Sequence, residues 1–223
     1  MHATSEAVDD YLKAILELSG PTEERVSSNA LAAHLGVRAA SVTGMLRKLA
    51  LQRPSFVKYE KHHGVRLSEA GRRRALEVLR HHRLLERFLV EFLGYSWDEV
   101  HEEAERLEHF ISERLEDRIA AKLGDPDMDP HGHPIPLRNG AMLVRSEVPL
   151  SGWSYGVPAT ISSVSDRDAA ALREFERMGL LPGIRVVVTG ASRDALRVRI
   201  GEAEPVRLSQ RLAGDVWVVG ESG

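Results

Sequence analysis

Residues 28–67 (SNALAAHLGVRAASVTGMLRKLALQRPSFVKYEKHHGVRL) decide the fold of the N-terminal part of the chain. Their first half predicts two short helices, 29–36 and 39–51, joined by a turn that contains glycine, which is the helix-turn-helix pattern. Their second half alternates between apolar and polar residues, turns near Gly64 and returns, which predicts a small β-hairpin. A helix-turn-helix followed by a basic hairpin is a winged helix-turn-helix.

The rest of the chain is helical first and then β. Helical spacing of apolar residues predicts further helices at 6–19, 69–92 and 97–123. A loop rich in Pro, Gly, Asp and His follows at 125–140. From about residue 156 the alternation has the two-residue period of strands, with one helix near 167–178, which is typical of a small barrel. The predicted fold class is therefore mainly α with a small all-β domain.

Composition excludes several classes of protein. The chain has no cysteine, which excludes disulfides, thiolate zinc sites and a cysteine nucleophile. No apolar run approaches the ~20 residues that span a bilayer. The first ten residues also lack the basic-then-apolar layout of a signal peptide. We therefore expect a cytoplasmic protein with no membrane partner.

Charge is distributed unevenly along the chain, although the net charge is only −3. Residues 38–87 hold 13 Lys and Arg against 4 Asp and Glu, a net of +9. Residues 98–129 hold 4 against 12, a net of −8. A basic block beside an acidic block is typical of proteins that bind nucleic acid, although solvated helix faces also produce charge runs.

Short polar and basic side chains lie on the two elements that would touch DNA. A helix in the major groove reads bases with side chains near its N-terminus, and a wing contacts phosphates. The candidate DNA-binding residues are Arg38, Ala40, Ser41, Thr43, Gly44, Arg47, Lys48, Lys58 and Lys61. A winged helix that serves only protein contacts is the alternative.

Histidines and carboxylates recur at helical spacing in the acidic block and in the helix before it. His101, Glu105, Glu108 and His109 are expected on one side of one helix, His82 and Glu86 lie one turn apart on the preceding helix, and Asp10 lies on the first helix. A carboxylate-rich ligand set without sulfur favours Mn²⁺ or Fe²⁺. Surface ion pairs are the alternative for any one His–Glu pair. A metalloprotease needs H-E-x-x-H, and His101-Glu102-Glu103-Ala104-Glu105 lacks the second histidine, so we expect no enzyme.

With these elements in this order, the chain resembles the diphtheria-toxin-repressor family of iron- and manganese-dependent transcription regulators. The resemblance covers essentially the whole chain. It is most specific at 80–89 (RHHRLLERFL), 100–109 (VHEEAERLEH), 129–136 (DPHGHPIP) and 177–188 (RMGLLPGIRVVV). The last segment is similar to the SH3-like barrel of that family and of ferrous-transport accessory proteins.

The resemblance implies a domain organisation and two metal sites per subunit. The domains would be a winged helix-turn-helix at 1–68, a dimerisation and metal-binding helical domain at 69–140, a linker at 141–155 and an SH3-like barrel at 156–223. One metal site would use His82, Glu86 and His101, with Asp168 of the barrel as a possible further ligand, and the other would use Asp10, Glu105, Glu108 and His109. Asp168 stands at a helix start, where a carboxylate is common for dipole reasons alone.

Two positions distinguish the branches of this family. Iron-responsive members have methionine and cysteine at the places of Asp10 and Glu105, whereas manganese-responsive members have oxygen donors there, so the resemblance favours Mn²⁺ over Fe²⁺. Lys13 departs from the second carboxylate that shorter manganese regulators carry, which disfavours a close pair of metal ions. Residues 51–55 (LQRPS) also make the connection to the wing longer than usual.

The function implied is a metal-dependent regulator of transcription. A homodimer would bind a palindromic operator in double-stranded DNA, as a repressor of metal-uptake genes, with no small-molecule substrate. Two alternatives stay open. One is a winged-helix regulator of a non-metal signal, and the other is a protein that stores or delivers metal, which the barrel suggests.

Overall fold

The computed structural model describes residues 5–20 and 23–220. Its contacts group the chain into two compact units. The first unit comprises residues 1–82, 107–112 and 136–142, and the second comprises 83–106, 113–135 and 143–223. The domain boundaries at residues 68, 140 and 155 remain predictions. Among the described residues, no helix is both long and apolar enough to cross a membrane.

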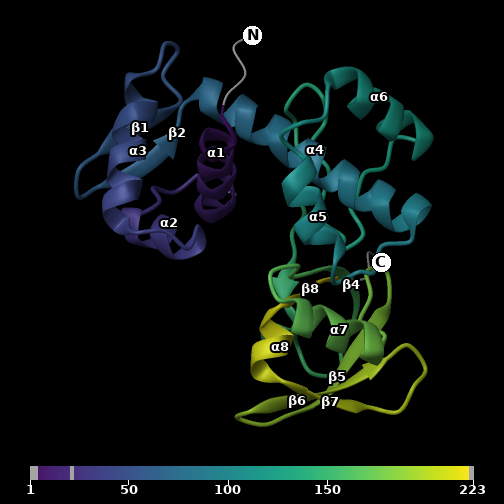
Figure 1. The fold of residues 1–223 in the computed structure, drawn as a ribbon. Coiled ribbons are helices and arrows are strands. Elements are labelled where there is room, and N and C mark those ends of the chain that lie inside the picture. Colours follow the sequence, from purple (N-terminus) through teal and green to yellow (C-terminus); the bar gives the residue numbers. More distant parts are fainter. Residues whose placement is uncertain (1–4, 21–22, 221–223) are drawn as a thin grey trace. The chain divides into compact units, whose positions relative to one another are not determined.

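A winged helix-turn-helix forms most of the first unit (Figure 1). Its elements are α1 (Glu6–Ser19), α2 (Ser28–His34), α3 (Ala39–Leu51), β1 (Val57–Glu60) and β2 (Gly64–Leu67). The two strands pair antiparallel with Val57 opposite Leu67, as the hairpin prediction requires. Leu12 and Ile15 of α1 and Leu46 of α3 are fully buried in one apolar cluster. Helices α2 and α3 of the helix-turn-helix each contribute apolar side chains from one side to this cluster, which holds them in place.

The helices that follow differ in one respect from the sequence prediction. Helix α4 (Glu69–Leu93) is the long helix expected at 69–92. The single helix expected at 97–123 is wrong, because two helices stand there, α5 (Val100–Leu107) and α6 (Glu113–Lys122). Residues 108–110 between them form a turn in which Glu108 is fully buried. Glu108 contacts Lys13 and His82, which are distant in sequence, and helical periodicity does not register such tertiary contacts.

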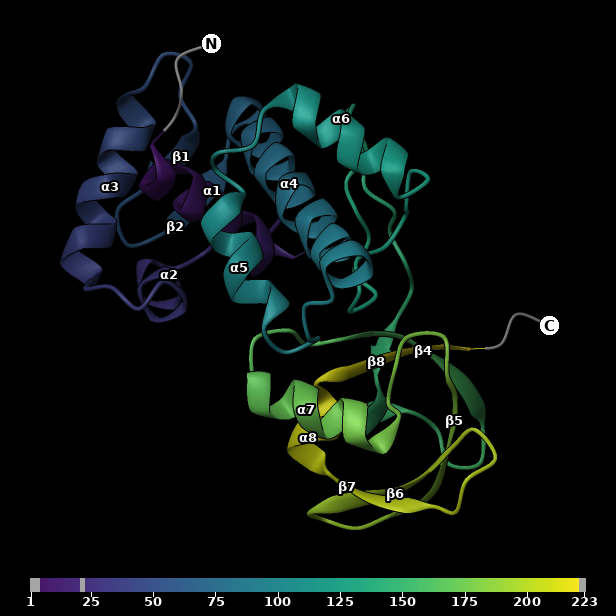
Figure 2. The ribbon, with the colours of Figure 1, turned by 45° about the vertical axis from the view of Figure 1, so that its right-hand side comes forward.

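A six-stranded antiparallel sheet closes around the core of the C-terminal part (Figure 2). Its strand order is β3-β8-β4-β5-β6-β7. The elements are β3 (Val148–Pro149), the 3-10 turn η1 (Leu150–Gly152), β4 (Pro158–Val164), α7 (Ala169–Met178), β5 (Arg185–Ala191), β6 (Ala195–Ile200), β7 (Val206–Ser209), α8 (Gln210–Gly214) and β8 (Val216–Gly220). Phe175 of α7 is fully buried among the apolar side chains of the sheet. The structure thus confirms a mainly α chain with a small β domain, in which β3 and η1 fall inside the stretch expected to be a linker.

Two glycines in helices give a test of the packing in the first unit. Gly71 in α4 is buried, and a Cβ there would overlap the backbone carbonyl of Phe56, whereas a Cβ on Gly44 in α3 would meet nothing. We expect Gly71→Ala to lower the free energy of unfolding by about 1–3 kcal/mol. Gly44→Ala should raise it by about 0.5–1 kcal/mol because alanine is the better helix former.

Urea unfolding of the two variants and the parent chain measures both effects. Equal stability of Gly71→Ala and Gly44→Ala would show that the contact between α4 and Phe56 is not as close as described.

Candidate metal centres and nucleic-acid interface

The reading surface of the winged helix is exposed and carries unpaired positive charge. All the candidate DNA-binding residues are exposed except Thr43, which is half-buried. A hollow of about 380 Å³ lies among the starts of α2 and α3 and the wing, and Thr43 and Lys61 line it. The basic candidates, none of which forms an ion pair with a residue that the structure describes, are Arg38, Arg47, Lys48, Lys58 and Lys61.

The first candidate metal cluster lies within the first unit and brings together Asp10, Glu108 and His109. Each offers one ligand atom, and these atoms lie within 4.8 Å of one another. His109 Nε2 is 3.0 Å from Asp10 Oδ1 and 3.6 Å from Glu108 Oε1. Asp10 comes from α1, while the other two come from the turn between α5 and α6. Two carboxylates and an imidazole converging from separate elements can hold a divalent first-row metal.

Glu108 is the buried centre of this cluster. Lys13 Nζ lies 2.6 Å from its Oε1, and His82 Nδ1 donates a hydrogen bond to its Oε2 at 2.6 Å. The backbone carbonyl of Glu108 accepts a hydrogen bond from His81 Nδ1 at 3.0 Å. A fully buried carboxylate is stable only when it is paired and hydrogen-bonded. The ammonium of Lys13, itself nearly buried, supplies that charge within the protein.

A second buried carboxylate, that of Asp9, lies near the Nδ1 side of the His109 ring. Asp9 accepts two hydrogen bonds from the guanidinium of Arg74, at 2.8 and 2.6 Å, which raises the pKa of Arg74. Asp9 Oδ2 also lies 3.7 Å from His109 Nδ1. Asp10 first and Asp9 second raise the pKa of His109 to about 10, so the imidazole is protonated near neutral pH unless a metal replaces the proton. A carboxylate behind a metal-binding histidine orients the ring and raises its basicity.

Glu105 belongs to a different compact unit from the other residues proposed for this site. It belongs to α5, in the second unit, whereas Asp10, Glu108 and His109 belong to the first. The expectation that one helix carries all four ligands of the acidic block is wrong, since Glu108 and His109 follow the end of α5. Participation of Glu105 in the first site therefore remains a prediction.

The second unit contains another cluster, Glu86, His131 and Asp166, whose ligand atoms also lie within 4.8 Å of one another. Glu86 and His131 are fully buried. The predicted ligand His101 joins it, with Nδ1 3.2 Å from Glu86 Oε1 and 3.9 Å from Asp166 Oδ2. The predicted ligand His82 belongs to the first unit, so its place in this set remains a prediction.

The hydrogen bonds of His131 leave one ring nitrogen available for a metal. Nε2 donates to the backbone carbonyl of Trp97 at 3.0 Å, which makes Nδ1 the unprotonated nitrogen of the neutral ring. Nδ1 is buried, has no hydrogen-bond partner among the described residues, and lies 3.9 Å from Glu86 Oε1. A buried lone pair facing two carboxylates fits a divalent cation, because the cation would satisfy all three groups.

Asp129 holds the loop that carries His131. Its Oδ1 accepts hydrogen bonds from the backbone N–H groups of His131 and His133, at 2.8 and 2.9 Å. Its Oδ2 lies 3.2 Å from His133 Nδ1. Burial opposes the charging of His133, but attraction to Asp129 outweighs it and raises the pKa of His133 to about 9. Burial likewise opposes the charging of Asp129, and attraction to His133 lowers the pKa of Asp129 in spite of it.

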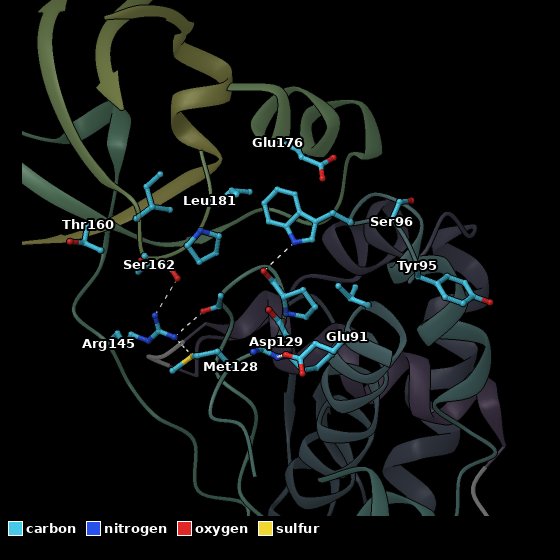
Figure 3. A pocket seen from close by; sticks show the side chains of 18 of the residues that line it. Glu91, Tyr95, Ser96, Met128, Asp129, Arg145, Thr160, Ser162, Glu176 and Leu181 are labelled. Atoms are coloured by element: carbon cyan, nitrogen blue, oxygen red, sulfur yellow. Dashed lines mark hydrogen bonds and ion pairs between the residues drawn. The ribbon is translucent and has the colours of Figure 1, made fainter. Parts of the chain in front are cut away.

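The barrel fastens this loop at its glycine. Gly132 has a φ of +90°, and a Cβ there would overlap the carbonyl of Ser162 in β4. Arg145 donates hydrogen bonds to the carbonyls of Gly132 (2.8 Å) and Ser162 (3.3 Å), and its side chain also contacts Met128 (Figure 3). A cavity of about 720 Å³ borders the loop. The loop is thus held at a backbone distance that only glycine allows.

The acid that the barrel contributes near the cluster is Asp166. Asp168, the ligand suggested by the sequence, caps α7 by accepting hydrogen bonds from the backbone N–H groups of Ala170 and Ala171. It also pairs with Arg211 at 3.3 Å. His131 and Asp166 were missed at the sequence level. The sequence HGH at 131–133 was the available signal, since histidine-rich tracts often bind metal.

Comparison with known proteins matches the chain in three consecutive segments. The description "Iron dependent repressor, N-terminal DNA binding domain" matches residues 3–65. The description "Iron dependent repressor, metal binding and dimerisation domain" matches residues 68–137, and "FeoA domain" matches residues 148–219.

Relatives and solved structures agree with these matches over nearly the full length. The iron-dependent repressor IdeR of Mycobacterium bovis is 29% identical over 98% of this chain and 99% of its own. A solved manganese-dependent transcriptional repressor in complex with manganese is 40% identical, covers 96% of this chain and 99% of its own, and has a TM-score of 0.88. The manganese regulator SloR is 30% identical, covers 96% of this chain and 98% of its own, and has a TM-score of 0.77.

His109 and His133, each close to carboxylates, are expected to titrate at unusually high pH. In metal-free protein, NMR should show His109 titrating near pH 10 and His133 near pH 9, the values to which their carboxylate partners raise the pKa. Because both values are raised, the stability that these pairs contribute is complete below about pH 6.5 and is lost as the pH rises through 9 to 10.

Asp129→Asn separates the two histidines. It should lower the pKa of His133 from about 9, since the attraction to Asp129 is lost while burial still opposes protonation and Asp166 still favours it, and leave His109 unchanged. If no histidine of the metal-free protein titrates above about pH 8, the described carboxylate pairs do not form in solution.

Proposed function

This chain belongs to the family of iron- and manganese-dependent repressors, and we propose that it is a DNA-binding transcription regulator that binds its operator when it holds Mn²⁺. The observation that carries the proposal is the cluster of Asp10, Glu108 and His109. It joins α1, whose apolar side forms part of the winged-helix core, to the turn at 107–112.

The preference for Mn²⁺ rests on the donor atoms. Asp10 and Glu108 offer carboxylate oxygens, His109 offers one imidazole nitrogen, and the cluster contains neither cysteine nor methionine. Hard oxygen donors suit Mn²⁺ and leave Fe²⁺ as the alternative. Glu105 at the end of α5 is the further oxygen donor that we propose for this site. Lys13 occupies one side of Glu108, which supports a single ion there.

The proposed mechanism is thermodynamic linkage between metal and DNA. Asp10 of α1 and Glu108 and His109 of the turn at 107–112 would hold the metal, and a shared ion would restrict how α1 packs on that turn. Since α1 packs on α2 and β2 of the winged helix, bound metal would favour one arrangement of the reading surface. DNA that binds this arrangement better must in turn raise the affinity for metal.

A homodimer on a palindromic operator is the proposed assembly. Two related reading helices α3, one from each subunit, would enter successive major grooves, with Lys58 and Lys61 of the wing on phosphates. Repression of metal-uptake genes, a cytoplasmic location and the absence of enzymatic activity follow from such a role. The exposed, unpaired basic side chains of the winged helix argue against a protein that only stores or delivers metal.

A second metal site is proposed at Glu86, His101, His131 and Asp166. Its support is the buried lone pair of His131 beside two carboxylates. His82, which the family resemblance adds to this set, donates a hydrogen bond to Glu108 within the first unit, and its participation in the second site stays a prediction. Asp168 is replaced in our proposal by Asp166, because the Asp168 carboxylate caps α7.

A regulator of a non-metal signal is the competing function. The ion pairs Lys13–Glu108 and Arg74–Asp9 favour it, since they neutralise two buried carboxylates without any metal. Calorimetry with Mn²⁺ separates the two functions, because the competing one predicts no binding.

Mn²⁺ should tighten operator binding. On a duplex selected from a random-sequence library in the presence of Mn²⁺, we expect mobility-shift affinity to rise about 5- to 150-fold when Mn²⁺ is added to metal-free protein. Glu105→Ala should lose most of this gain, whereas Glu102→Ala, an exposed neighbour on α5, should keep it. Equal affinity with and without Mn²⁺ in the parent chain would refute the function, and an unchanged response in Glu105→Ala would remove Glu105 from the site.

Asp166 and Asp168 give a matched pair for the second site. Asp166→Asn should weaken one class of Mn²⁺ site by about 10- to 100-fold in calorimetry. Asp168→Asn should leave both classes unchanged, because asparagine caps a helix about as well as aspartate. Loss of a site in Asp168→Asn with retention in Asp166→Asn would reverse the assignment.

A further inference from the structure

Three arginines stand side by side on the outer face of the barrel sheet. Arg197 of β6 lies directly opposite Arg207 of β7 in the strand register. Arg199 follows two residues after Arg197 and therefore points to the same face. The burial pattern agrees, since all three are exposed and Val198 between the first two is buried. Figure 2 shows β6 and β7 running next to each other at the edge of the sheet. We call these three residues the arginine face.

The arginine face lacks the counter-charges that some other arginines of the C-terminal part have. Arg173 pairs with Asp98, and Arg177 with Glu174. None of Arg197, Arg199 and Arg207 forms an ion pair with any residue in the described ranges 5–20 and 23–220. The strands of this sheet carry no aspartate or glutamate at all. Like charges directly opposite on neighbouring strands destabilise a sheet, so this arrangement is unfavourable in the isolated protein.

Two features fit the arginine face to a phosphate ligand. Gly190 of β5 lies opposite Arg197 in the register, and the Arg197 side chain passes 3.5 Å from where a Cβ of Gly190 would be, so its stem extends across β5. Residues 148–223 contain nine arginines and no lysine. Arginine presents a planar fork of donors that binds phosphate oxygens in pairs, which lysine cannot do.

We propose that the arginine face binds the phosphate backbone of double-stranded DNA, as a second and sequence-independent contact in addition to that of the winged helix. The inference rests on the proposed function, since the DNA is the polyanion that the reading surface already holds. Attachment of the barrel to the same chain raises the local concentration of phosphates around it. The negative charge on DNA is continuous, so the contact needs no particular base sequence.

The salt dependence of DNA binding tests the proposal in the full chain. The probe is a mixed-sequence duplex of about 60 base pairs, titrated by fluorescence anisotropy between about 0.05 and 0.2 M KCl. Arg197→Gln/Arg207→Gln should make the slope of log affinity against log salt shallower by about 2, since each phosphate contact contributes about 0.9. The affinity at the lowest salt should fall on the order of tenfold.

Two further double variants separate the causes. Arg173→Gln/Arg177→Gln removes the same charge from the same barrel but from α7, where both arginines are ion-paired, and its slope should equal that of the parent chain. Lys58→Gln/Lys61→Gln on the wing should weaken binding whether or not the arginine face takes part. Circular dichroism confirms that each variant is folded.

The outcomes distinguish the inference from the proposed function. An unchanged slope in Arg197→Gln/Arg207→Gln, together with weaker binding in Lys58→Gln/Lys61→Gln, overturns the inference and leaves the proposed function standing. Equal changes in both barrel variants also overturn it, because total charge would then be the cause. If the sedimentation coefficient of Arg197→Gln/Arg207→Gln differs from that of the parent chain in the absence of DNA, the arginine face contacts a second copy of this chain. That result overturns the inference. Binding unaffected by the wing variant counts against the proposed function itself.

Discussion

The burial of the Glu108 carboxylate is the constraint on which the rest of the first unit depends. A carboxylate with no exposed surface must be given positive charge and hydrogen bonds, and this chain collects them from α1 and α4 through Lys13 and His82. The same demand breaks the acidic stretch into α5 and α6, because the turn between them carries Glu108 inward. The candidate metal cluster, a contact from α1 and the turn between α5 and α6 therefore meet at one buried group.

The architecture was predictable because it follows from patterns of residues close together in the sequence. The helix-turn-helix, the wing and α4 follow from apolar periodicity and turn residues, and the change of period near residue 156 marks the barrel. The break at residues 108–112 was not predictable in this way. Helical spacing continues across it, and only contacts with distant residues make the turn favourable.

The same distinction applies to the site residues. Asp10, Glu108 and His109 could be predicted because the latter two are neighbours in sequence and the first matches a family position. His131 and Asp166 were missed because their meeting depends on how a loop docks on β4, which no spacing encodes. Asp168 was predicted as a metal ligand although it stands at a helix start. At that position its carboxylate accepts hydrogen bonds from the first backbone N–H groups of α7.

Lys13 gives the first cluster a resident cation, and this has a consequence for the concentration at which the protein would respond. In the proposed function, a metal ion that binds Oε1 of Glu108 would compete with the ammonium group of Lys13 for that oxygen. The free energy of that exchange is subtracted from the intrinsic affinity of the ligands. For the proposed regulator, Lys13 would therefore act as a competitor within the chain, and the position of this one side chain would raise the metal concentration needed for a response.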